Sequence, residues 1–171
     1  MRTLISGASG LIGSALRTSL EADGNSIVSL TRSPQTPSDV PWQPLAGELE
    51  PAAIEGFDVI VHLAGESIAG RWTSRKKAEI RASRVQGTQL LAKTIAGLSS
   101  PPQVLVSSSA TGYYGDRGEE VCTERMTAGT SFLANISQEW EKAASVASSA
   151  TRVVTARTGI VLARESGAQA K

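Results

Sequence analysis

Three glycines near the start of the chain constrain its fold more than any other feature. Gly7, Gly10 and Gly13 follow a short apolar run, Thr3 to Ser6, and precede a helical pattern that extends from Ile12 to Ala22. Glycine at such a junction permits a tight turn and lets a helix pack closely on the preceding strand. The sequence therefore predicts that the chain begins with a strand, a glycine turn and a helix.

Short apolar runs alternate with helix-sized segments along the rest of the chain. Runs of this kind, rich in valine, isoleucine and leucine, are typical of parallel strands covered on both faces. The predicted strands are Thr3 to Ser6, Ile27 to Thr31, Val59 to Leu63, Val104 to Ser107 and Val153 to Ala156, and the predicted helices are Ile12 to Ala22, Ser74 to Ala96 and Ser131 to Ala147. The proline-rich stretch from Ser33 to Pro51 is predicted to be mostly loop, with one short strand near Trp42. The order of elements indicates an α/β fold in which residues 1–171 form one domain.

Charge and cysteine content exclude several classes of function. The 17 basic and 16 acidic residues give a net charge of +1 without a long run of one sign, which argues against a nucleic-acid or membrane-surface binder. The single cysteine, Cys122, excludes an internal disulfide. The single histidine, His62, is interpreted as a packed residue of a buried strand, so no metal site is expected. Neither a secretory signal nor an uninterrupted apolar window of roughly 18 residues is present. We expect a cytoplasmic protein whose partner is a small molecule.

The glycine turn also predicts chemistry. Its backbone N–H groups can face a pyrophosphate at the N-terminus of the following helix, because Gly10 has no Cβ to block the approach. The hydroxyl of Ser9 can add a donor. We therefore predict a dinucleotide site formed by Gly7, Ser9, Gly10, Leu11, Ile12 and Gly13.

The end of the second predicted strand favours one dinucleotide over another. NAD-binding domains usually place an acidic residue there against the ribose 2′-hydroxyl, but this chain has Thr31 and Arg32. A guanidinium can hold a 2′-phosphate through two hydrogen bonds. The sequence therefore favours NADP(H) over NAD(H), the alternative being that Arg32 is a solvated loop residue.

Further motifs resemble the extended branch of the short-chain dehydrogenase/reductase superfamily, the relatives of sugar-nucleotide epimerases and dehydratases. The first set is Val61-His62-Leu63-Ala64-Gly65, Val85-Gln86-Gly87-Thr88 and Ser107-Ser108-Ser109-Ala110-Thr111. A second set resembles the "epimerase family protein" subgroup, often labelled cell-division-inhibitor-like: Gly65-Glu66-Ser67-Ile68, Arg71-Trp72, Ser83-Arg84-Val85, Gly112-Tyr113-Tyr114-Gly115, Trp140-Glu141 and Arg157-Thr158-Gly159-Ile160-Val161-Leu162. The resemblance implies a Rossmann-type, doubly wound parallel sheet with strand order 3-2-1-4-5-6.

The resemblance also implies further cofactor contacts. The backbone of Leu63, Ala64 and Gly65 is expected to run beside the adenosine half of the cofactor. Arg84 is expected to place a second cation near the phosphates, with Glu79 one helical turn away to orient it. A surface pair of Arg84 and Glu79 is the alternative.

The catalytic expectation is incomplete. Short-chain enzymes use a Tyr-x-x-x-Lys pair and a serine or threonine, and Ser109 matches the serine, but Phe132 and Ile136 stand where the pair is expected. The only tyrosines, Tyr113 and Tyr114, lie in a glycine-bounded turn. We name Ser109, Tyr113 and Tyr114 as catalytic candidates, and Tyr114 is equally well interpreted as a structural residue.

Two hypotheses of different classes follow. The chain is an NADP(H)-dependent oxidoreductase or epimerase with an atypical acid/base group, or it is a non-catalytic NADP(H)-binding sensor or interaction module. In extended-branch proteins the substrate pocket lies largely in the segment after the Arg157-to-Leu162 motif. We expect this chain to lack that segment. Related proteins often pair through two long helices, so a homodimer is compatible with the resemblance.

Overall fold

Six parallel strands form one sheet in the order β3-β2-β1-β4-β5-β6. The computed structural model describes residues 1–163. Its strands are β1 (Arg2–Ser6), β2 (Ser26–Thr31), β3 (Val40–Pro41), β4 (Val59–His62), β5 (Val104–Ala110) and β6 (Arg152–Thr158). The predicted Rossmann-type α/β fold and its strand order are confirmed.

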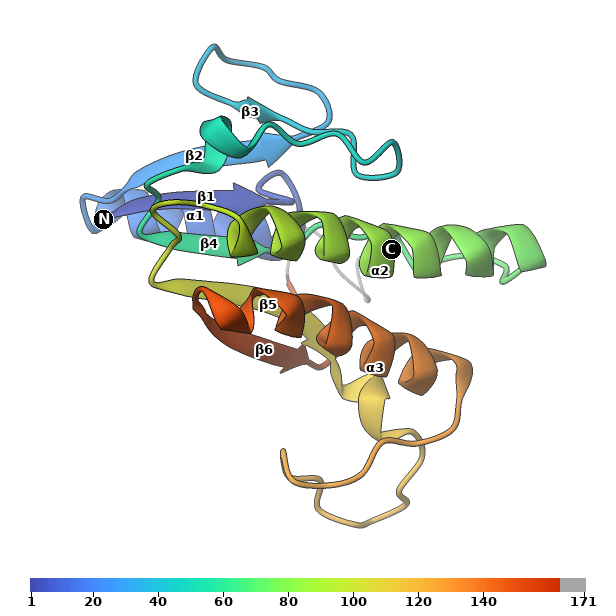
Figure 1. Cartoon of the computed structure of the whole chain (residues 1–171). Coiled ribbons are helices and arrows are strands. Elements are labelled where there is room, and N and C mark those ends of the chain that lie inside the picture. Colours follow the sequence, from blue (N-terminus) through green and yellow to red (C-terminus); the bar gives the residue numbers. More distant parts are fainter. Residues whose placement is uncertain (164–171) are drawn as a thin grey trace.

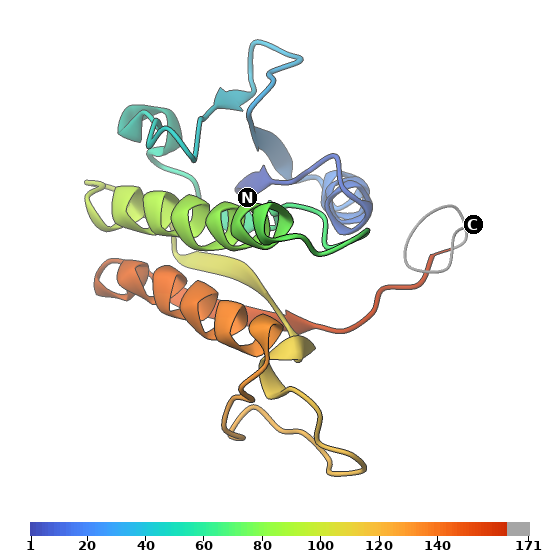
Figure 2. The same cartoon turned by 90° about the vertical axis from the view of Figure 1, so that its right-hand side faces the viewer.

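Helices cover both faces of this sheet. The α-helices are α1 (Leu11–Ala22), α2 (Ser74–Ala96) and α3 (Phe132–Ala144), and the short 3-10 helices are η1 (Pro51–Ile54), η2 (Thr111–Tyr114) and η3 (Ser145–Ser149). Figures 1 and 2 show α2 and α3 side by side on one face and α1 on the other. Thr73 and Ser131 begin α2 and α3, because each side chain accepts a hydrogen bond from a first-turn N–H of its helix.

The observed elements differ from the predicted ones mainly at their ends. The helix predicted from Ser131 to Ala147 ends at Ala144 and continues as η3. β5 and β6 extend further than predicted because their pairing continues to Ala110 and Thr158. The sequence also predicts the start of a helix at Ala168 to Lys171, and these residues lie outside the described part of the chain.

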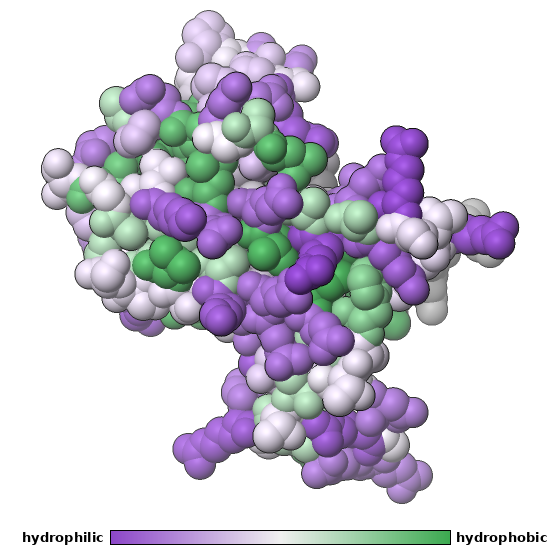
Figure 3. Space-filling model, turned by 45° about the vertical axis from the view of Figure 1, so that its right-hand side comes forward, coloured by the Kyte–Doolittle hydropathy of each residue, from purple (hydrophilic) through white to green (hydrophobic). Residues whose placement is uncertain are grey.

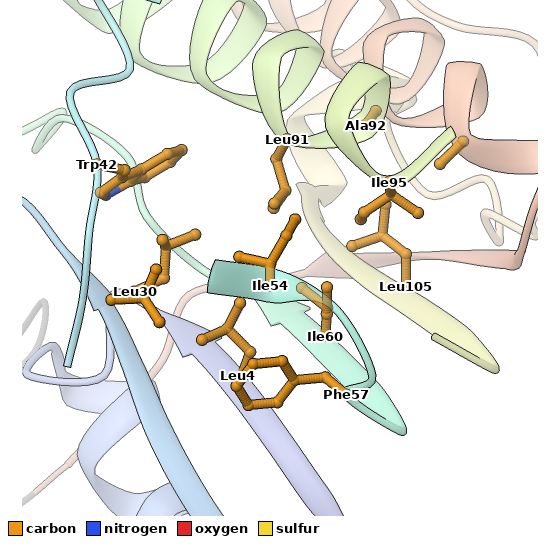
Figure 4. Packing of buried hydrophobic residues seen from close by; sticks show 12 residues of the cluster. Leu4, Leu30, Trp42, Ile54, Phe57, Ile60, Leu91, Ala92, Ile95 and Leu105 are labelled. Atoms are coloured by element: carbon orange, nitrogen blue, oxygen red, sulfur yellow. The ribbon is translucent and has the colours of Figure 1, made fainter. Parts of the chain in front are cut away.

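The main hydrophobic core lies between the sheet and α2. Leu4, Leu30, Ile60 and Leu105 come from the strands, and Leu91 and Ile95 from α2, as Figure 4 shows. Trp42 and Phe57 close the cluster from the connecting segments. Every one of these side chains is at most 5% exposed, so α2 is fixed against the middle of the sheet by apolar burial.

Two regions at the carboxyl ends of the strands matter for function. β1 lies between β2 and β4, so the strand order reverses there, and sheets of this kind bind ligands at such a reversal. Beyond η2, residues 115–130 form a projection that Figure 3 shows as mostly hydrophilic.

Among the described residues, no helix combines the length and the apolar character that crossing a bilayer requires.

Candidate functional site

The glycine turn packs directly against the loop that follows β4. Gly7 has φ of +72°, and a Cβ there would come within 2.9 Å of the backbone of Leu63 and Ala64. A Cβ on Gly13 would overlap the carbonyl oxygen of Gly7. Only glycine can therefore occupy these two positions without moving the backbone.

The first turn of α1 leaves donors free at the reversal of the strand order. Gly10 caps the helix without a side chain, and within residues 1–163 no acceptor receives a hydrogen bond from the N–H groups of Leu11, Ile12 and Gly13. Ser9 and Gly10 are exposed. Free amides at the positive end of a helix suit an anion. The turn thus has the geometry that a cofactor pyrophosphate requires.

A buried chain of polar side chains fixes the loop after β4. Ser6 Oγ accepts hydrogen bonds from the N–H groups of Leu63 and Ala64, both at 3.2 Å. The Ser6 proton therefore goes to His62 Nδ1, 2.6 Å away, and His62 Nε2–H donates to Thr88 Oγ1 at 2.9 Å. Burial lowers the pKa of His62 to about 4. The interpretation of His62 as a packed structural residue is confirmed.

Arg84 holds the same loop from α2. Its Nη1 donates to the carbonyl oxygen of Glu66 at 2.9 Å, and its guanidinium lies 3.5 to 3.6 Å from where a Cβ of Gly65 would be. Burial lowers the pKa of Arg84, while the nearby Glu66 carboxylate acts in the opposite direction. Arg84 is therefore a half-buried positioning residue rather than a member of a surface pair.

The expected pairing of Glu79 with Arg84 is wrong. Glu79 Oε1 accepts instead from Arg75 Nε at 2.8 Å. Residues five positions apart on a helix point about 140° away from each other, whereas residues four apart share a face. Glu79 therefore turns toward Arg75 and solvent.

Positive charge gathers at the end of β2 around Glu66. Lys76 Nζ lies 2.5 Å from Glu66 Oε1. This hydrogen bond holds the pKa of Glu66 below its ordinary value, although burial acts in the opposite direction. The charges of Arg32 and Arg84 lower the same pKa further. Arg32 is exposed and follows Thr31, the last residue of β2. Within the part of the chain that the structure describes, its guanidinium makes no hydrogen bond or ion pair. Arg32 is thus available to an added anion.

A second polar cluster lies at the carboxyl ends of β5 and β6. Ser109 and Arg157 are direct neighbours across the two strands, and both side chains reach Glu141 of α3. Ser109 Oγ donates to Glu141 Oε1 at 2.6 Å, and Arg157 forms two bonds to the carboxylate, at 2.7 and 2.8 Å. Burial tends to raise the pKa of Glu141, but the hydrogen bonds from Arg157 and Ser109 outweigh it and lower that pKa. Glu141 is therefore a fixed, ionised acceptor.

Arg157 also connects this cluster to the tyrosines. Its Nη1 donates to Tyr114 Oη at 3.0 Å, and its guanidinium carbon lies 3.5 Å from the ring centre of Tyr113. Hydrogen bonding to Glu141 raises the pKa of Arg157, and Tyr114 adds to this effect. Tyr114 and Arg157 line an open cleft of about 940 Å³ together with residues of the projection. The structure thus joins all three catalytic candidates in one cluster. Ser109 contacts Glu141, and the two tyrosines contact Arg157, which is bound to the same carboxylate.

Glu141 and Arg157 belong to this cluster, and reasoning from sequence did not assign either residue to a site. A signal was present, because Arg157 follows four apolar or small residues, 153–156, near the end of its strand, and a half-buried arginine requires a partner. The positions expected for the missing pair carry no acid/base group: Ile136 is buried, and the Phe132 ring packs 5.7 Å from that of Trp72. Within residues 1–163, no group of three or more His, Cys, Asp or Glu side chains is arranged to hold a metal ion.

Comparisons with known proteins agree with this geometry. The profile of the NAD dependent epimerase/dehydratase family matches residues 3–163. An epimerase family protein of Mycobacterium bovis is 39% identical over 166 residues, which are 95% of this chain and 54% of that protein. Human epimerase family protein SDR39U1 is 36% identical over 172 residues, covering 98% of this chain and 57% of its own length. The chain thus spans about half the length of these relatives.

Two solved structures are similar throughout the chain. The nucleoside-diphosphate sugar epimerase from Corynebacterium glutamicum superposes with a TM-score of 0.86 at 37% identity, over 99% of this chain and 36% of that one. The human protein SDR39U1, solved with NADPH, also gives a TM-score of 0.86, at 34% identity, over 98% of this chain and 57% of that one.

Proposed function

The chain belongs to the NAD dependent epimerase/dehydratase family, and on that premise we propose that it binds NADP(H) at its glycine turn. We infer further that it is an oxidoreductase or epimerase of the extended short-chain dehydrogenase type. Its substrate is then a small carbonyl or hydroxyl compound such as a sugar nucleotide.

The first turn of α1 is the observation that carries the proposal. Within residues 1–163, the three consecutive amides from Leu11 to Gly13 have no protein acceptor, and they lie at the reversal of the strand order. A Cβ on Gly10 would come within 3.3 Å of the Gly7 carbonyl oxygen, so a larger residue there would crowd the turn. These features suit a pyrophosphate, and the loop at Leu63, Ala64 and Gly65 provides the adjoining wall for adenosine.

The preference for NADP(H) rests on Arg32. Arg32 is exposed and has no partner among the described residues, and like Lys76 and Arg84 it acts on the Glu66 carboxylate. Such a guanidinium favours a doubly charged 2′-phosphate over a ribose hydroxyl. The human relative was solved with NADPH, which supports the same choice.

The reaction itself requires groups at the carboxyl ends of β5 and β6. A bound nicotinamide would supply or accept the hydride. Ser109 would contact the substrate oxygen, and Tyr114 would hold or move the proton, because its hydroxyl accepts from Arg157 and still has its own proton to donate. Tyr113 would act through its ring, which packs on Arg157.

A calorimetric titration of the chain with NADPH and with NADH tests the cofactor proposal. We expect NADPH to bind more tightly, and Arg32→Ala to weaken NADPH binding by about 1.5 to 3 kcal/mol with little effect on NADH. Arg125→Ala, which removes an exposed arginine from the projection, is the matched control and should bind both cofactors like the parent. Equal weakening of both cofactors by Arg32→Ala would remove Arg32 from the 2′-phosphate site.

One observation favours a non-catalytic cofactor sensor as the second candidate. Phe132 and Ile136 cannot transfer protons, and the Ser109 proton is already bound to Glu141. Turnover of NADPH with any member of a panel of carbonyl compounds and nucleoside-diphosphate sugars would exclude this alternative. Tight NADPH binding without turnover in the full-length protein would favour it.

A further inference from the structure

The Arg157 guanidinium is held by four hydrogen bonds that restrict its orientation. Its Nε and Nη2 hold the two oxygens of Glu141, and its Nη1 donates to Tyr114 Oη at 3.0 Å and to the carbonyl oxygen of Glu124 at 3.4 Å. The ring of Tyr113 lies against one face of it, 3.5 Å away. Arg157 and Glu141 are each only 16% exposed. A planar cation is therefore held in one position, with one edge directed at one phenol oxygen.

The hydrogen-bond inventory gives the two candidate hydroxyls opposite roles. The ionised Glu141 carboxylate can only accept, so Ser109 donates its proton to it and presents only lone pairs to a ligand. Arg157 can only donate, so Tyr114 Oη accepts from it and keeps its own proton for a ligand. Tyr114 lines the open cleft. Of the two hydroxyls, Tyr114 is thus the one that can give a proton to a substrate oxygen.

We propose that Arg157, held in place by Glu141, is the cation that stabilises the phenolate of Tyr114, so that Tyr114 and Arg157 form the acid/base pair of this site. This inference rests on the proposed function. In the reducing direction, the carbonyl carbon of the substrate takes a hydride from the reduced nicotinamide, and its oxygen takes the proton of Tyr114. The C=O double bond becomes C–O–H, NADPH becomes NADP⁺, and the phenolate left on Tyr114 keeps its hydrogen bond from Arg157. Water in the open cleft then returns a proton to Tyr114.

The Tyr114–Arg157 pair differs from a Tyr-x-x-x-Lys pair in how it is assembled. Both members of that pair lie on one helix, whereas Tyr114 ends η2 and Arg157 lies in β6. Glu141 of α3 is a positioning residue, because it touches Arg157 and Ser109 rather than the reacting atoms. Within residues 1–163, Arg157 contacts the Tyr114 hydroxyl with Glu141 behind it, the Tyr113 ring lies beside the Tyr114 ring, and Arg117 contacts the Tyr114 backbone. The other charged or titratable groups at the cleft are Asp116, Glu120, Cys122 and Glu124.

The cofactor-free chain allows a direct test, because it has only two tyrosines. In a Tyr113→Phe background, which keeps the ring on Arg157, the phenolate absorbance reports on Tyr114 alone. Arg157→Gln combined with Glu141→Gln removes the cation without leaving a buried unpaired carboxylate. Arg117→Gln is the matched control, because Arg117 donates to the backbone carbonyl of Tyr114 and not to its hydroxyl.

The proposal gives each variant its own direction. Relative to the Tyr113→Phe chain, the double variant should form phenolate at a pH higher by about one unit or more, and Glu141→Gln alone at a lower pH, because it leaves the cation unopposed. Arg157→Lys should form phenolate at a lower pH than the double variant, and Arg117→Gln should follow the Tyr113→Phe chain. Circular dichroism over the same pH range shows which points belong to folded protein.

Two results would overturn the pair. The first is a phenolate titration curve of the double variant that coincides with the curve of the Tyr113→Phe chain. The second is a curve of Arg117→Gln that shifts as far as that of the double variant. The titration needs neither cofactor nor substrate, so its failure is distinct from that of the proposed function. NADPH binding in calorimetry with no change in phenolate formation rejects the Tyr114–Arg157 pair alone, whereas absence of NADPH binding rejects the proposed function.

Discussion

His62 should make the stability of this protein fall as the pH falls below the ordinary pKa of histidine. It is fully buried, and burial lowers its pKa from 6.5 to about 4. The folded state therefore holds His62 neutral, while the unfolded chain takes up a proton as the pH falls below 6.5. A depressed histidine pKa contributes stability that is present above the unfolded value and lost as the pH falls toward the folded value.

The two pKa values determine the size of the effect. Between pH 7.5 and pH 5, proton uptake by the unfolded chain should lower the free energy of unfolding by about 2 kcal/mol. Charging His62 in the folded state would also break the bond that its Nδ1 accepts from Ser6, which holds the loop at Leu63 and Ala64. The loss should therefore appear as global unfolding rather than as a local adjustment.

Urea denaturation at pH 7.5, 6.5, 5.5 and 5.0 measures the effect. His62→Gln is the control, because it keeps a neutral polar group and removes the only histidine of the chain. The variant should lose about 2 kcal/mol less than the parent over this range, whatever its stability at pH 7.5. Equal pH dependence of the two proteins, or a native-state NMR titration of His62 with a midpoint near 6.5, would refute the reasoning.

Three further predictions concern packing, capping and surface charge. Gly13→Ala should lower the free energy of unfolding by about 1 to 3 kcal/mol and weaken NADPH binding, because the added methyl overlaps the carbonyl oxygen of Gly7. Thermal melts measure the first effect and calorimetry the second, and an unchanged melting temperature would contradict the overlap. Thr73→Ala should cost about 1 kcal/mol by removing the side-chain cap of α2, measured by urea denaturation. Arg81 and Glu139 form an exposed ion pair that joins α2 to α3. A double-mutant cycle should give a coupling energy below about 1 kcal/mol for this pair, and a larger value would contradict its description as a solvated contact.

The elements and the glycine turn could be predicted because their signals are local. Apolar strands in a parallel sheet and the spacing of Gly7, Gly10 and Gly13 are visible in a few neighbouring residues. The ends of elements were less accurate: β6 begins one residue earlier and ends two later than predicted, because its last residues are held by pairing with β5. Such pairing is a long-range interaction and leaves little trace in the strand's own sequence.

Side-chain partners were predicted less well than positions. Glu79 was assigned to Arg84, but helix geometry gives it to Arg75. Ser109 was named as a catalytic candidate from its motif, but its bond to Glu141 depends on how α3 packs across the sheet. No local pattern connects these two residues.

The sequence by itself determined that this chain forms an α/β fold with parallel strands covered on both faces and a glycine turn at its first helix. Periodicity, chain direction and the steric needs of a turn are properties of adjacent residues, and they suffice for that. Only the tertiary structure decided that Glu141, Arg157 and Tyr114 form one hydrogen-bonded cluster with Ser109. The reason is physical: strand register sets Arg157 beside Ser109, and the packing of α3 turns Glu141 toward both, so these contacts exist only once the layers are assembled.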